Sequence, residues 1–145
     1  SMEEFEEMSL AGRTWQDHLR NAWTRDNLGR NQWMLSRLEA RMAAYPDKEL
    51  VMVTHMLPIK EFTVPQEMGN WSYFNAFLGS RKLGELYTRY PVKAAICGHV
   101  HYRKSLEKQG IYWMCRCLNY HTEWRPQDGE TLGEQMEKAA EVLEL

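Results

Sequence analysis

The chain is 145 residues long, with 43% hydrophobic and 26% charged residues, a composition that indicates one globular domain and excludes disorder, collagen and coiled coil. The formal net charge of -2 provides no overall positive field, so we do not expect nucleic acid as a partner except as a nucleotide-type substrate. The apolar runs are far shorter than the roughly 20 residues that span a bilayer. Three cysteines, an odd number without a secretory signal, favour a reducing compartment, so we expect a cytoplasmic protein without a membrane partner.

The first part of the chain is predicted to become helical after a loose start. Residues 1–13 are acidic and lack a clear period, so we expect a loose lead-in there. The Thr-x-x-Asp spacing that begins at Thr14 is typical of a helix-capping box and predicts a helix to about Trp23. A second, amphipathic helix is indicated by apolar residues at every fourth position, namely Met34, Leu38 and Met42.

Two short apolar runs, residues 50–54 and 93–97, predict strands that are covered on both faces. Between them, residues 56–79 form a long loop with several aromatic residues, and residues 80–90 repeat apolar side chains at helical spacing. Strands covered on both faces are typical of the parallel pairs in α/β domains. We therefore expect the two strands to lie next to each other inside the domain.

The C-terminal third predicts one more strand and one more helix. Residues 111–117 alternate in the manner of a half-buried strand after a hairpin turn at Gly110. Thr131 begins a second capping box, which predicts a final helix that reaches Leu143. The order helix, strand, helix, strand, strand, helix indicates a single α/β domain over residues 1–145 with at least one parallel strand pair.

Histidines follow both apolar strands. His55 comes directly after the first strand, and Gly98 leads the second strand into His99 and His101. Because the carboxyl ends of neighbouring parallel strands converge on one crevice, we expect the three imidazoles to meet there. Glycine before His99 permits a tight backbone turn. Neutral imidazole binds zinc, iron and related ions, so the pattern predicts a metal site.

Residues 51–58 (Val-Met-Val-Thr-His-Met-Leu-Pro) and 95–101 (Ala-Ile-Cys-Gly-His-Val-His) resemble the last two motifs of the calcineurin-like metallophosphoesterases, and the resemblance covers roughly residues 30 to 120. It implies a phosphatase or related hydrolase with a four-layer α/β/β/α sandwich and a two-metal centre that hydrolyses phosphate monoesters or diesters. By resemblance, His55 and His99 would hold one divalent ion and His101 the other, as catalytic metal ligands for manganese, iron or zinc.

The family's upstream ligands, an Asp-x-His, a Gly-Asp and an Asn-His, are absent from this sequence. We therefore expect the chain to be the C-terminal half of such an enzyme, with fewer metal ions and incomplete activity by itself. The opening Ser1 and Met2 are typical of a remnant of a cleaved tag, which agrees with a shortened chain. A half-domain with a bare sheet edge is expected to pair with the N-terminal half or to self-associate.

Three further side chains are expected to contact the phosphate-ester substrate at the mouth of the site: Tyr73, Asn75 and His121. Two other interpretations remain open. In the first, the fold is kept as a non-catalytic protein-interaction scaffold, and the aromatic residues of segment 62–77 supply the contact surface. In the second, the three histidines and Cys97 hold a single zinc ion.

Overall fold

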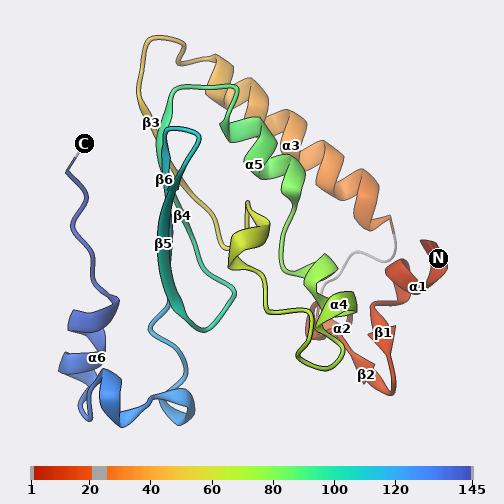
Figure 1. Ribbon diagram of the computed structural model, residues 1–145. Coiled ribbons are helices and arrows are strands. Elements are labelled where there is room, and N and C mark those ends of the chain that lie inside the picture. The colour runs from red at the N-terminus through yellow and green to blue at the C-terminus, as the bar shows by residue number, and fades with distance from the viewer. Residues whose placement is uncertain (1, 21–25, 145) are drawn as a thin grey trace.

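The structure, a computed structural model, describes residues 2–20 and 26–144, and its centre is a four-stranded mixed sheet (Figure 1). The strands lie in the order β3 (Leu50–Val53), β4 (Val92–Cys97), β6 (Ile111–Arg116) and β5 (Arg103–Lys108). β3 is parallel to β4 and β4 is parallel to β6, whereas β5 is antiparallel to β6. The α/β class and the parallel pairing of the two apolar strands are thus confirmed.

Two helices, α3 (Asn27–Ala43) and α5 (Arg81–Tyr87), cover one face of this sheet (Figure 1). The core between them and the sheet includes Trp113 and Tyr87, which are fully buried and whose rings stack with centroids 6.1 Å apart. On α3 the inner stripe consists of Leu35, Leu38 and Met42. Met34, which the sequence pattern assigned to this stripe, is 57% exposed. The helix turns by about 100° per residue, so when Leu35 faces the core its neighbour Met34 points away from it.

The N-terminal segment differs from the expected loose lead-in. It forms α1 (Met2–Glu7), a hairpin of β1 (Ser9–Leu10) and β2 (Arg13–Thr14), and the short helix α2 (Gln16–Arg20). Met8 is buried and the ring of Phe5 stacks on Phe77. Burial against aromatic side chains distant in sequence therefore orders this segment. The expected helix end near Trp23 lies outside the described residues.

The long segment between β3 and α5 contains three short helical turns, η1 (Lys60–Phe62), α4 (Trp71–Phe74) and η2 (Asn75–Phe77). Its phenylalanines point inward, since Phe62, Phe74 and Phe77 are at most 6% exposed. The segment is therefore a packed part of the domain, with the N-terminal hairpin against it.

After β6 the chain forms the turns η3 (His121–Glu123) and η4 (Pro126–Asp128) and then α6 (Leu132–Ala139). In Figure 1, α6 lies on the side of the sheet opposite α3 and α5. Thr131 and Glu134 form the predicted capping box. The helix ends at Ala139 and not near Leu143, where we expected its end. The residues after Ala139 are extended and run along the sheet. There the carboxylate of Glu141 accepts a hydrogen bond from the hydroxyl of Tyr112 and forms an ion pair with Arg116, both residues of β6. Among the described residues, no helix combines the length and the apolar character needed to cross a membrane.

Candidate functional site

The structure brings His55 and His99 into direct contact. His55 follows β3 and His99 follows β4, and the Nε2 atom of His55 lies 2.9 Å from the Nδ1 atom of His99. Their ring centroids are 4.6 Å apart. The parallel register, in which Val53 pairs with Ile96, places the two strand ends level with each other. The contact is therefore a consequence of strand pairing and not of a local sequence motif.

The backbone at this contact is built differently from our expectation. The positive φ angle of 70° belongs to His99 itself, whereas Gly98 has no such angle. At Gly98 a Cβ atom would lie 3.4 Å from Nδ1 of His55, which is an ordinary van der Waals contact. The amide of Gly98 donates to the carbonyl of His55. The left-handed turn therefore falls on the histidine, one of the residue types that tolerate it.

His99 is partly enclosed. The ring of Trp15 meets it edge-on with centroids 5.8 Å apart, and its Nε2 atom is buried without a hydrogen-bond partner in residues 2–20 and 26–144. Burial, and then the neighbouring His55 imidazole, hold the pKa of His99 below the ordinary value of 6.5. A lowered pKa keeps the imidazole neutral, which is the form that binds a metal ion.

His101 points to a different partner. Its Nδ1 atom lies 2.7 Å from Oε2 of Glu123, and the ring of Tyr120 meets it edge-on at 4.6 Å. The side chain of His101 is 35% exposed and that of Glu123 is 44% exposed. The structure therefore brings two of the three predicted histidines together and gives the third a carboxylate partner that the sequence had not indicated.

The pair of His55 and His99 has the geometry of a partial metal-ligand set. Two nitrogens that bind one tetrahedral ion at 2.0–2.1 Å are about 3.3 Å apart, so the observed 2.9 Å separation needs to widen only slightly. Across residues 2–20 and 26–144, no group of three or more His, Cys, Asp or Glu side chains is arranged to hold a metal. In a metal site the pair would supply two ligands, and the others would come from elsewhere.

The three residues expected to bind substrate are placed as follows. The hydroxyl of Tyr73 donates to the carbonyl of Glu4. The amide of Asn75 accepts from the backbone N–H of Val64 at 3.1 Å and donates to the carbonyl of the same residue at 2.7 Å. His121 packs its ring against Trp124 at 5.1 Å. Tyr73 and Asn75 therefore use their polar groups inside the fold, and a substrate contact by any of the three stays a prediction.

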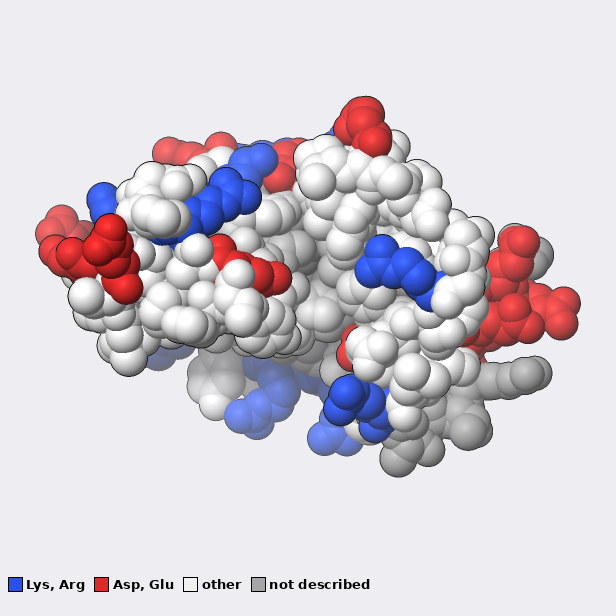
Figure 2. Space-filling view, turned by 90° about the horizontal axis from the view of Figure 1, so that it is seen from below, with Lys and Arg blue, Asp and Glu red and all other residues white. Residues whose placement is uncertain are grey.

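Figure 2 views the protein from the end at which β3 and β4 finish. It shows a shallow central depression, with Lys, Arg, Asp and Glu side chains in separate groups around it.

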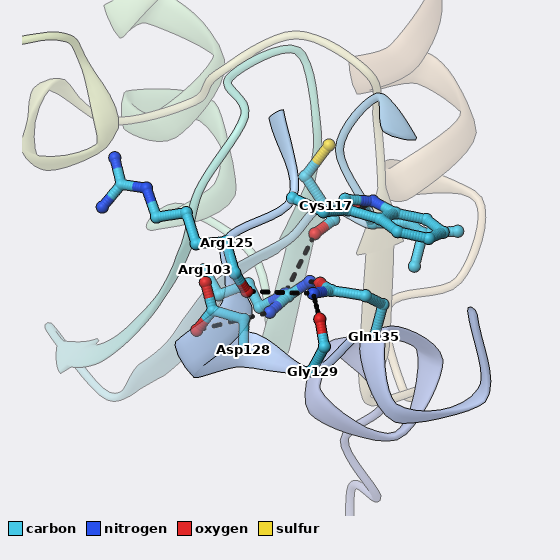
Figure 3. A network of polar contacts seen from close by, with 8 residues as sticks. Arg103, Cys117, Arg125, Asp128, Gly129 and Gln135 are labelled. Carbon is cyan, nitrogen blue, oxygen red and sulfur yellow. Dashed lines mark hydrogen bonds and ion pairs between the residues drawn. The ribbon is translucent and has the colours of Figure 1, made fainter. Parts of the chain in front are cut away.

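A buried polar network fixes the segment that carries Glu123 (Figure 3). The guanidinium of Arg103 donates to the carbonyl of Cys117 at 3.2 Å and to the side-chain oxygen of Gln135 at 2.8 Å. The amide of Gln135, which is 1% exposed, donates in turn to the carbonyls of Gly129 at 2.7 Å and Arg125 at 3.5 Å. The network thereby holds the chain on both sides of residues 118–124.

No protein-family model matches this chain, and no curated protein matches it. The similarity to metallophosphoesterases therefore depends on the two motifs at residues 51–58 and 95–101. The geometry adds that the histidines of the two motifs meet, since Nε2 of His55 lies 2.9 Å from Nδ1 of His99.

Proposed function

We propose that this chain contributes to a metal-dependent phosphoesterase that hydrolyses a phosphate monoester or diester. The observation that carries the proposal is the convergence of His55 and His99, 2.9 Å apart at the ends of two parallel strands. When bound, two divalent ions such as manganese, iron or zinc would supply an acidified water and neutralise charge on the phosphoryl oxygens. Imidazoles supply no negative charge, and across residues 2–20 and 26–144 no group of three or more His, Cys, Asp or Glu side chains is arranged to hold a metal, so the carboxylate ligands would come from a further segment.

The chain's own residues have distinct tasks in this proposal. His55 and His99 hold one cation through the two nitrogens that now face each other, and His101 holds the other. The ring of Trp15, packed edge-on against His99, keeps water away from one side of that imidazole. The sheet with α3 and α5 would form one sheet and one helical layer of a four-layer sandwich, and the other two layers would come from a further segment.

The two other interpretations find less support. A scaffold that binds a partner through the aromatic residues of segment 62–77 needs those rings on the surface, but Phe62, Phe74 and Phe77 are at most 6% exposed. A zinc site that includes Cys97 needs its thiol near the histidines, but Cys97 is 5% exposed and belongs to the core beneath the helices. The exposed imidazole of His55 and the partly buried one of His99 fit a site at the surface better.

Hydrolysis is tested by expressing the chain together with any coding sequence that precedes it in its reading frame. We expect this protein to cleave bis-p-nitrophenyl phosphate or p-nitrophenyl phosphate in the presence of manganese, and His99→Ala to remove the activity. His18→Ala, which changes an exposed imidazole on α2, is the matched control. Residues 1–145 alone should turn over poorly, because the carboxylate ligands are missing. No turnover by the longer protein with manganese, zinc or iron would rule out hydrolysis and favour the scaffold.

A further inference from the structure

We propose that Glu123 is a positioning residue for His101, and that it holds the imidazole with its proton on Nδ1 so that Nε2 is free to bind the metal. The inference rests on the proposed function and adds to it a residue that neither the motifs nor the histidine pattern contains. Its basis is the 2.7 Å separation between Nδ1 of His101 and Oε2 of Glu123. Glu123 lies beyond the end of β6, in η3.

The chemistry of the contact decides which nitrogen is free. A neutral imidazole carries one proton, and a carboxylate can only accept a hydrogen bond, so the nitrogen that faces Glu123 carries the proton. The other nitrogen, Nε2, then has an available lone pair. A carboxylate on the far side of a metal-binding imidazole fixes the tautomer, orients the ring and makes the ligand more basic. Glu123 also brings a negative charge next to His101.

The segment that carries Glu123 is held in place. The backbone N–H of Glu123 donates to the carbonyl of Tyr120 at 2.8 Å. The indole of Trp124 donates to the carbonyl of Leu118 at 3.0 Å. The Tyr120 ring meets the His101 ring edge-on, which limits its rotation. The Arg103 and Gln135 network fastens the chain before and after this segment (Figure 3). A carboxylate on a fixed support can select one ring orientation, whereas a mobile one cannot.

The tautomer is measured directly by long-range proton–nitrogen correlation NMR on the metal-free protein, at a pH well above the ordinary imidazole pKa of about 6.5. We expect His101 to show the Nδ1–H pattern in the unchanged protein. Glu123→Ala should shift it towards the Nε2–H pattern, and Glu123→Gln, which keeps an acceptor oxygen, should give a smaller shift. The imidazole of His18 is an internal control that should not change, and retained dispersion of the amide spectrum shows that each variant is folded.

Metal binding provides the second measurement. The affinity for zinc is measured in whichever form binds it, residues 1–145 or the longer protein. There Glu123→Ala should weaken zinc affinity by about 10–100-fold, the usual effect of removing such a partner. Glu137→Ala, an exposed glutamate on α6, should leave it unchanged. An unchanged tautomer together with unchanged affinity would overturn the proposal. A large loss of affinity with an unchanged tautomer would also overturn it, because Glu123 would then be a direct ligand. A tautomer shift in a protein that binds no metal would support the positioning role and refute the proposed function.

Discussion

The substitution Gln135→Ala tests the buried network that supports the candidate site. It removes the acceptor for Arg103 and the donor for Gly129 and Arg125. Because the side chain of Arg103 is 13% exposed, water cannot readily replace the lost acceptor. A hydrogen bond to a charged group contributes about 1.5–3 kcal/mol and a neutral one about 0.5–1.5 kcal/mol, so the expected loss in unfolding free energy is about 2–4 kcal/mol. The better helix propensity of alanine offsets only a few tenths of this.

Urea denaturation followed by circular dichroism measures the effect. We expect the midpoint to fall with an unchanged slope, since the surface exposed on unfolding hardly changes. Glu137→Ala, on an exposed position of the same helix, should change the unfolding free energy by no more than about 0.5 kcal/mol. If Gln135→Ala also stayed within that range, the network would not be a stabilising contact, and its role in fixing residues 118–124 would have to be abandoned.

Three further substitutions test other contacts in the structure. Gly98→Ala places a methyl group in ordinary van der Waals contact, 3.4 Å from Nδ1 of His55, and should leave zinc affinity and stability nearly unchanged; a large loss of affinity would show that the imidazole has no room for it. Asn75→Ala removes both bonds to Val64 and should cost about 1–3 kcal/mol of unfolding free energy, whereas a purely substrate-binding side chain would cost almost none. Burial raises the pKa of Glu141, but bonds from Tyr112 and Arg116 outweigh burial and lower it below 4.5. Its stabilising effect is therefore present above that value and lost as pH falls through the lowered pKa, so the destabilisation by Glu141→Gln should be clear near neutral pH and shrink as the pH falls below 4.5; an effect independent of pH would contradict this.

The two apolar strands could be predicted from local patterns, and the contact of His55 with His99 from the parallel pairing of those strands. The expectation that both strands are covered on both faces was wrong for β3, where Val51 and Val53 are 40% and 71% exposed. A short apolar run indicates a buried strand, and parallel strands place their carboxyl ends at one edge of the sheet. The contact of His55 with His99 needs no information beyond that pairing. The capping box at Thr131 was equally local, since Thr131 and Glu134 bond each other across a single turn.

The remaining features depend on contacts between distant residues. β5 has the sequence Arg-Lys-Ser-Leu-Glu-Lys, which is too polar to indicate a strand, and forms because it pairs with β6 at the edge of the sheet. The order of the N-terminal segment comes from the packing of Phe5 and Met8 on rings of segment 62–77. Glu123 reaches His101 only after the chain has turned back at the end of β6, and nothing in its sequence neighbourhood marks it.

The central claim is that His55 and His99 bind the same metal ion. It is tested most directly by competition titration of zinc against a coloured chelator, using the unchanged protein, His55→Ala, His99→Ala and the double variant. Two ligands of one ion are energetically coupled, so we expect each single variant to lose most of the affinity and the double variant to lose little more. His121→Ala, at an imidazole packed on Trp124, is the control. Affinity that is unchanged in either single variant would contradict a shared metal at the ends of β3 and β4.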